Sequence, residues 1–214
     1  LGWTDEIQQT NISGEDQDLS HDRIAALRLG VSLNRCLTGC LGIDFQFSRG
    51  IDIASRSQGD VGKGTPLSRS SGKNNFSHFN LDTTYAVALD KNLEFNINTG
   101  GQLSLDDLLN SEQSSITGPD KLSGFTSGSI SGDESWYFRG QLNYKKKLSN
   151  KLTLTPYVYG ATGVSYTLTP TATENRATAA RSIGLGLKMD GIDNYFFDKN
   201  ISAKVEYSKN CLLY

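Results

Sequence analysis

The chain has 214 residues, of which 36% are hydrophobic and 22 are glycine, and its formal net charge is −2. This near-zero charge argues against a nucleic-acid-binding protein, because no basic stripe is present beyond the short run at residues 145–147. The longest apolar run, at residues 85–89, is far shorter than the roughly 18–20 residues that a membrane helix needs, which excludes a helical membrane protein.

The first distinctive feature in chain order is a pair of cysteines, Cys36 and Cys40. Their spacing would allow a disulfide across a tight hairpin in an oxidising compartment, but two free thiols fit the sequence equally well. No second Cys/His pair accompanies them, which argues against a zinc site. Cys211 stands alone, and no cofactor or metal is expected.

Alternation of apolar with polar or small residues is clearest over residues 79–89. A period of two over about eleven residues is what a tilted strand needs to cross a bilayer. No helix is predicted. The same alternation predicts eight strands, at residues 27–33, 41–48, 79–89, 93–99, 136–144, 152–162, 183–189 and 201–207.

The connections between these strands alternate in length. Short turns at one rim and long loops at the other are typical of outer-membrane barrels, whereas a soluble sandwich, which also alternates in hydrophobicity, has no such rule. The predicted fold class is therefore all-β, a transmembrane antiparallel β-barrel. The short connections are residues 34–40, 90–92 and 145–151, the long ones are 54–75, 104–135 and 166–180, and 190–200 is intermediate.

Two sets of strand residues carry expectations about orientation. The charged residues on the polar face are expected to point into the barrel, and they are Asp44, Asp82, Glu94, Arg139, Lys204 and Glu206. Aromatic residues near strand ends are expected to form an interfacial girdle, and they are Trp136, Tyr157, Tyr159, Tyr195, Phe196 and Phe197.

The two histidines give no support to an enzyme. His78 lies at a predicted strand entrance near Asp82, and His21 lies beside Asp22, but neither accompanies a nucleophile motif. We therefore expect no catalytic site, and we expect His78 to be a solvated residue of the rim.

A series of short motifs runs through the second third of the chain and beyond. The motif positions on strands and loops are Arg69, Gln102, Ser111, Glu112, Gln113, Arg139, Ala161 and Gly163, and those of the long loop are Leu122, Ser123, Gly124, Phe125, Gly132 and Asp133. In order and spacing these motifs resemble the barrel of two-partner secretion transporters, the haemolysin-activation and filamentous-haemagglutinin-secretion family, from residue 66 to about residue 207. By this resemblance, the motifs of the long loop belong to a pore loop.

The resemblance implies a sixteen-strand barrel that follows periplasmic domains. The eight strands of this chain would be about the eighth to the fifteenth, so residues 1–214 are expected to be the C-terminal half of the barrel, without the periplasmic domains. The chain begins at Leu1 with no visible signal peptide, which fits a processed chain or a fragment. The long loop at residues 104–135 would fold back into the pore.

Simple chemistry suggests roles for the pore-loop residues. A loop inside a pore must approach strand backbones closely, which favours Gly124 and Gly132. Phe125 could wedge the loop tip against the inner wall, and Asp133 could accept hydrogen bonds from loop amides. The same residue types would also occur in an ordinary surface loop.

At two positions the chain departs from the family pattern. The family's loop motif carries an arginine where this chain has Ser123, and a nearby strand motif carries an aspartate where this chain has Ala161. The resemblance implies that these two groups pair in relatives. Joint loss of both is less costly than loss of one, because no unpaired buried charge remains. It leaves the way the loop is anchored undetermined.

The resemblance implies that the protein is a pore of the Gram-negative outer membrane that exports a large secreted partner, of adhesin, cytolysin or toxin type, and binds no nucleic acid. Three alternatives stay open at this stage. They are a passive porin-like channel, an outer-membrane barrel assembly factor, and a small self-contained eight-strand barrel.

Overall fold

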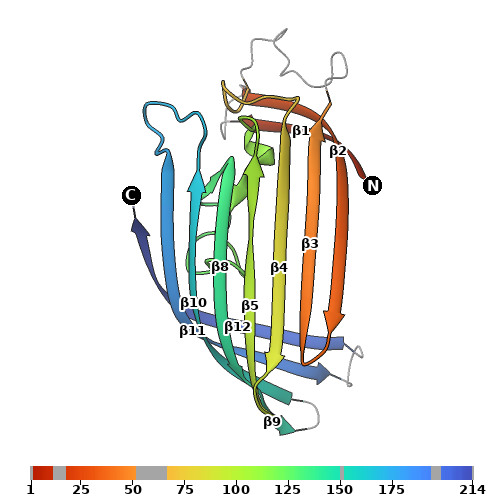
Figure 1. The fold of residues 1–214 in the computed structure, drawn as a ribbon. Coiled ribbons are helices and arrows are strands. Elements are labelled where there is room, and N and C mark those ends of the chain that lie inside the picture. Colours follow the sequence, from red (N-terminus) through yellow and green to blue (C-terminus); the bar gives the residue numbers. More distant parts are fainter. Residues whose placement is uncertain (1, 12–17, 52–66, 150–151, 194–198, 214) are drawn as a thin grey trace.

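A computed structural model describes residues 2–11, 18–51, 67–149, 152–193 and 199–213 (Figure 1). They form one antiparallel sheet of ten strands. In the described part of the chain no helix is long and apolar enough to cross a membrane. The strands of the sheet are β1 (Gly2–Asn11), β2 (Asp18–Cys36), β3 (Gly39–Gly50), β4 (Ser77–Ala88), β5 (Leu93–Ser104), β8 (Glu134–Tyr144), β9 (Lys146–Ser149), β10 (Leu152–Tyr166), β11 (Ala177–Asp193) and β12 (Lys199–Leu213).

Each strand pairs with the next along the chain, in the order β1-β2-β3-β4-β5-β8-β10-β11-β12, with the short β9 on β10. All eight predicted strands are present and most are longer than predicted, because strand ends near the rims carry charged residues that blur the alternation. The sequence prediction missed β1 and β9. In the stretch of β1, Asp5, Glu6 and two glutamines separate the few apolar residues, so the period of two is weak.

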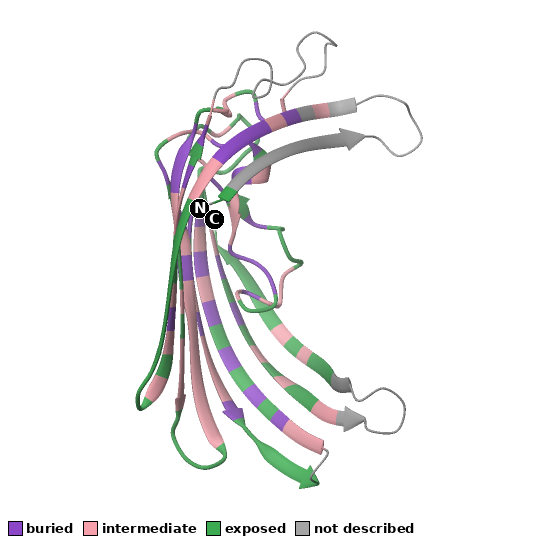
Figure 2. Cartoon of the chain, turned by 90° about the vertical axis from the view of Figure 1, so that its right-hand side faces the viewer, coloured by how far each residue is buried: buried purple, intermediate pink, exposed green. Residues whose placement is uncertain are grey.

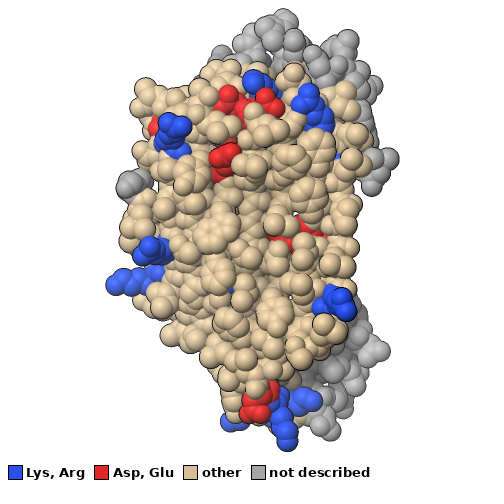
Figure 3. Space-filling view, viewed as in Figure 1, with Lys and Arg blue, Asp and Glu red and all other residues tan. Residues whose placement is uncertain are grey.

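The sheet is strongly curved, with one convex and one concave face (Figure 2). Apolar side chains on the convex face are exposed, as with Val31, Val158 and Ile183, which are 69%, 55% and 66% exposed. Figure 3 shows that charged residues are sparse over the middle of this face and gather mainly near its two ends. Polar side chains such as Asp82, Arg139 and Glu206 point to the concave side. There they form hydrogen bonds with residues of other strands or of the long loop.

Short and long connections lie at opposite ends of the sheet (Figure 1). The short turn between β2 and β3 contains the disulfide Cys36–Cys40, with an S–S distance of 2.06 Å, which decides between the two alternatives for these cysteines. Cys211 is free and exposed. The aromatic residues at positions 195–197 lie outside the described residues.

The described sheet does not close on itself. β1 and β12 are its two edges, and no pairing between them is present among the described residues. The alternative of a self-contained eight-strand barrel therefore does not describe this structure. The buried apolar side chains form two clusters, and both join the long connections to the concave face.

Candidate functional site: a long loop held on the concave face

The connection between β5 and β8, residues 105–133, lies against the concave face of the sheet (Figure 2). It contains one turn of 3-10 helix, Asn110–Glu112, and a two-strand ribbon of β6 (Ser114–Ser115) and β7 (Ser131–Gly132). The residues between β6 and β7 form a tip that reaches down the wall of the sheet. We call residues 105–133 the pore loop.

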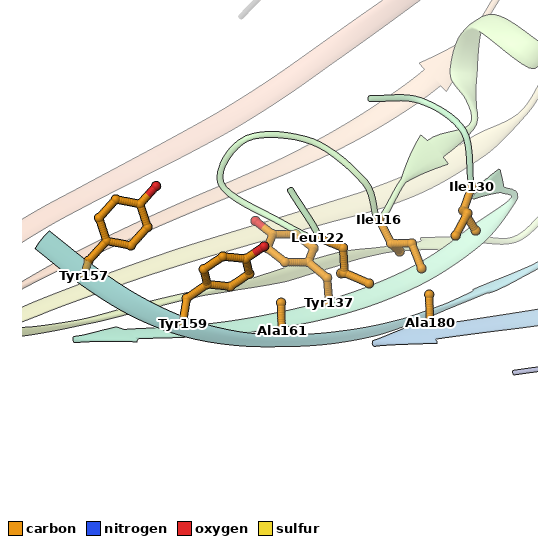
Figure 4. Packing of buried hydrophobic residues seen from close by; sticks show 8 residues of the cluster. All are labelled: Ile116, Leu122, Ile130, Tyr137, Tyr157, Tyr159, Ala161 and Ala180. Atoms are coloured by element: carbon orange, nitrogen blue, oxygen red, sulfur yellow. The ribbon is translucent and has the colours of Figure 1, made fainter. Parts of the chain in front are cut away.

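Apolar contacts hold one side of the pore loop to the wall. Ile116 and Leu122 are fully buried and Ile130 is 8% exposed. They pack on residues of β8, β10 and β11 (Figure 4). Phe125 is partly buried and packs against this cluster. The wall residues of this cluster are Tyr137, Tyr157, Tyr159, Ala161 and Ala180.

Tyr157 and Tyr159 therefore do not belong to an outer girdle, and that expectation was wrong. They share the parity of Ala161 on β10, which faces the concave side, whereas Val158 between them faces outward. Aromatic residues suit both an outer girdle and an inner wall. Only their position in the alternation along the strand shows on which face they lie. On β8, Tyr137 faces the concave side, so its neighbour Trp136 faces the opposite side. Trp136 is exposed on the convex face, as expected.

The tip is anchored by one cation and one acid that come from different strands. Arg139 of β8 is 2% exposed and donates a hydrogen bond of 2.5 Å from Nη1 to Oγ of Ser123. Its Nη2 lies 3.3 Å from Oε2 of Glu206, on β12. The hydroxyl of Ser123 donates in turn to the other carboxylate oxygen of Glu206. Ser123 thus links the two charges, and we call these three residues the tip anchor.

Neighbours orient both charged groups of the tip anchor. The guanidinium of Arg139 lies over the ring of Tyr159, 3.7 Å from its centroid. Tyr157 donates a hydrogen bond of 2.7 Å from its hydroxyl to Glu206, and Nζ of Lys204 lies 3.4 Å from the same carboxylate. Glu206 therefore has partners on the loop, on β8, on β10 and on its own strand.

Gly124 lies next to the tip anchor, where the loop backbone approaches β12 most closely. Its carbonyl oxygen accepts a hydrogen bond from the side-chain amide of Asn210. A Cβ atom at Gly124 would collide with the side chains of Asn210 and Ser208. A residue without a side chain is needed at this contact.

The tip anchor lies at the two positions where the chain departs from the expected motif. Ala161 lies directly opposite Arg139 in the pairing of β10 with β8. In this chain the basic group at the tip comes from the wall and the acid comes from β12. Ser123 lies between these two charges.

We call the parts of the pore loop outside the tip, residues 105–115 and 131–133, its root. The root is fixed at a buried carboxylate. Asp133 is fully buried and forms an ion pair of 2.6 Å with Arg69. It also accepts hydrogen bonds from the backbone amides of Leu108, at 2.9 Å, and Leu168, at 2.8 Å. These partners come from the connections β3–β4, β5–β8 and β10–β11, so one carboxylate joins all three long connections.

A second buried acid holds the 3-10 turn of the root against the wall. Glu112 receives two hydrogen bonds from Arg28 of β2, at 3.0 and 2.6 Å, and its Oε2 lies 3.1 Å from Nε2 of His78 on β4. Burial alone would raise the pKa of Glu112, but the bonds from His78 and Arg28 outweigh it and hold that pKa below its ordinary value. His78 is 2% exposed, so the expectation of a solvated rim histidine was wrong.

The remaining motif residues also lie at the root. Gln102 donates to the carbonyl oxygens of Glu112, at 3.0 Å, and Asp133, at 3.1 Å. A Cβ atom at Gly132 would collide with the carbonyl oxygen of Tyr166, and one at Gly163 would come within 3.2 Å of Ile116. Gln113 lies 3.4 Å from Asp133, and the buried hydroxyl of Ser111 has no hydrogen-bond partner.

On its other side the pore loop leaves a polar cavity of about 500 Å³ against β2 to β5. The residues that line it include Asp44, Asn80, Asp82, Glu112 and Lys121. The tip is thus held by β8, β10, β11 and β12, and the cavity lies between it and β2 to β4. The rest of the loop is bonded to β2 and β4 through Arg28 and His78. Among the described residues no group of three or more His, Cys, Asp or Glu side chains could hold a metal ion.

Motif reasoning from the sequence found the loop residues but missed most of their partners on the wall. Glu206, Asn210, Arg28 and His78 contact the loop over 34 to 86 residues of sequence separation. The parity of the strands was the usable signal, since every wall partner lies at a position that alternation assigns to the inner face.

Comparison with known proteins agrees with this arrangement. The family described as haemolysin secretion/activation protein ShlB/FhaC/HecB matches residues 4–189. No curated protein matches the chain significantly. CdiB from Escherichia coli is similar in structure, with a TM-score of 0.65 and 18% sequence identity over 92% of this chain. The chain spans 39% of the length of that structure. Because the family match covers most of its length, the chain belongs to the ShlB/FhaC/HecB family of haemolysin secretion/activation proteins, the two-partner secretion family that its motifs resemble.

Proposed function

We propose that this chain is part of an outer-membrane pore that exports a large secreted partner protein, and that the pore loop is its plug. The observation that carries this proposal is the attachment of the pore loop to the concave face at both its root and its tip. A loop that only covered a rim would have no need of buried partners deep on the inner wall.

The two faces of the sheet support a location in a membrane. The convex face carries many exposed apolar side chains and few charged ones over its middle. The concave face carries polar and charged side chains. A soluble sheet buries its apolar face and exposes its polar one. The reverse arrangement is what a barrel wall in lipid needs, because its outside faces hydrocarbon and its inside faces water.

The two attachments of the pore loop suit different tasks. The root is held by buried ion pairs, which are costly to break one partner at a time. The tip is held by apolar packing of Leu122 and Phe125 and by hydrogen bonds of Ser123 and Gly124. An extended polypeptide in the pore can replace these hydrogen bonds with its own backbone groups. The exported chain would therefore displace the tip and leave the root in place. Folding of the partner outside the cell would supply the driving force, without nucleotide or cofactor.

The test is a secretion assay with the full-length protein that contains this chain. Deletion of its gene should leave the secreted partner inside the cell, and the wild-type gene should restore export. The partner is expected to be a large β-helical protein encoded beside the transporter gene. Continued export in the deletion strain would refute the proposed function. This outcome does not depend on any variant of the pore loop.

A further inference from the structure

The convex face carries a groove that packing of the sheet does not explain. Gly140 on β8 and Gly160 on β10 are paired neighbours that face outward. A Cβ atom at Gly160 would meet nothing within 4 Å, and one at Gly140 would meet only ring atoms at 3.6 Å or more. Gly100 and Gly184, in contrast, face inward and are packed against their neighbours. The two outward glycines leave space where other residues would place side chains.

This space is part of an apolar groove of about 520 Å³ across β5, β8, β10, β11 and β12. Apart from glycines and one lysine, its outward-facing lining is apolar or aromatic. Its walls are formed by Phe95, Leu142, Val158, Ile183, Leu185 and Tyr207. These residues lie in two adjacent outward rows, so the groove extends mainly across the strands. Its size and lining suit a segment of hydrocarbon chain, and a face that meets disordered lipid has no need of such a groove.

Two cations lie at one end of the groove. Lys209 lines it directly and pairs across the strands with Ile183. Arg181 is the next outward residue of β11 beyond Ile183, and both cations are exposed. Figure 3 shows basic side chains at this margin, over the C-terminal strands. In the part of the chain that the structure describes, neither cation forms an ion pair or a side-chain hydrogen bond.

The order of these features along the strands gives the site a direction. The cations lie on the side of the long connections, and the apolar walls at Leu142, Val158 and Leu185 lie toward the short turns. Long loops face the cell exterior in outer-membrane barrels. A lipid of the outer leaflet has the same polarity, with its headgroup outermost and its acyl chains below.

We propose that Arg181, Lys209 and the groove over Gly140 and Gly160 form a binding site for a phosphate-bearing lipid of the outer leaflet. Unpaired cations on a lipid-facing surface are costly, and a phosphate headgroup supplies the missing anion. One acyl chain fills the groove. The site rests on the proposed membrane location, but it is separate from the pore loop and from export.

The experiment uses the delipidated full-length protein in detergent, with phosphatidylglycerol as the acidic probe and phosphatidylcholine as the neutral one. Bound lipid is counted by native mass spectrometry. Wild-type protein is expected to retain several-fold more of the acidic lipid. The double variant Arg181→Gln with Lys209→Gln should lose this preference, while Lys146→Gln with Lys147→Gln, at the opposite end of the sheet, should keep it.

A second pair of variants tests the groove. Gly160→Leu adds a side chain to open space, so the fold tolerates it, and it should reduce retention of the acidic lipid several-fold. Ala203→Leu adds the same side chain to the convex face outside the groove and should leave retention unchanged. Lipid A in place of phosphatidylglycerol should compete for the same site.

Equal retention of both probes, or full retention by Arg181→Gln with Lys209→Gln, would overturn the lipid site and leave the export proposal intact. Failure of the protein to bind any lipid or detergent would instead overturn the membrane location on which both proposals rest.

Discussion

Arg139 and Glu206 form a charge pair between two strands, and Ser123 of the loop tip bonds to both. A guanidinium at position 123 would have to occupy the space that Arg139 already fills beside Ser123. Only a small residue at the tip permits the wall to supply the cation. The alanine at position 161 fits the same logic, because it lies opposite Arg139 and a carboxylate there would compete with Glu206.

This interpretation makes a prediction for position 123. Ser123→Arg should loosen the tip, because two guanidinium groups would then share one carboxylate. Adding Ala161→Asp should restore part of the loss, since it supplies a second acid opposite Arg139, with a coupling of order 0.5–3 kcal/mol. Protease resistance of the pore loop and export of the partner are the measurements.

The control for this pair is Thr126→Arg, which adds the same charge to an exposed position of the same loop. It should change neither measurement. If the double variant behaves no better than Ser123→Arg alone, position 161 does not share the electrostatic environment of the tip.

Glu112 gives the root of the pore loop a dependence on pH. Its pKa is lowered in the folded protein, so the stability that it contributes is complete above the ordinary carboxyl pKa and is lost as the pH falls through the folded value. The protection factors at residues 108–113, which compare exchange with that of an unstructured chain at the same pH, should therefore fall in acid. The variant Glu112→Gln should have lower protection factors at neutral pH and show less change in this acid range. Protection factors that are independent of pH in the wild type would contradict this role.

At the scale of elements, the two parts of the pore loop are held by different contacts, which is the basis for proposing a fixed root and a displaceable tip. Asp133 joins three connections in a buried position, and such a junction cannot open without leaving a charge unpaired. The tip lies between two glycines with positive φ, Gly118 at 148° and Gly128 at 78°. These two positions tolerate the backbone rotation that a change of tip position requires.

The close approach at Gly124 predicts how the tip can be detached. A cysteine at Ser123, in a protein whose native cysteines are replaced, should react slowly with a bulky impermeant maleimide on intact cells, whereas one at Thr173 should react quickly. Adding Gly124→Val should raise the rate at position 123, because a branched side chain collides with Asn210 and Ser208.

The matched control is Thr126→Val, which places the same side chain on an exposed residue of the tip and should leave the rate unchanged. Fast labelling at position 123 without Gly124→Val would mean that the tip is open to the outside. The export assay should follow the labelling, with impaired export for Gly124→Val and normal amounts of protein in the membrane.

The physical chemistry of each element explains how much of it could be predicted from the sequence. Strands β4, β5 and β10 were predictable because one face of each is apolar and the other polar, so the period of two is explicit. The tip anchor could not be predicted from this alternation, because Arg139 and Glu206 meet only once the sheet curves and brings β8 and β12 toward one loop. Alternation fixes the face on which a side chain lies, and curvature decides which side chains on that face meet.

At the scale of the whole molecule, the two free edges of the sheet are decisive. β1 and β12 each pair on one side only within the described residues, and an unpaired strand edge in hydrocarbon costs several kcal/mol for each exposed backbone group. The 214-residue segment alone should therefore not refold in detergent as a stable monomer.

Gel mobility before and after heating, combined with circular dichroism, measures this outcome. The segment alone should give a mixture of oligomers, while the full-length protein should migrate as one species whose mobility changes on heating. A monodisperse segment with a heat-dependent mobility would mean that these strands close by themselves.

The polar cavity beside the tip of the pore loop has a consequence for the electrical behaviour of the proposed pore. The cavity between the loop and β2 to β5 is lined by charged and amide side chains, which keep water and mobile ions in place. Under the export proposal, the closed pore is therefore expected to pass a small current of ions through this space. Displacement of the tip should register as a step above that baseline in recordings from a planar bilayer.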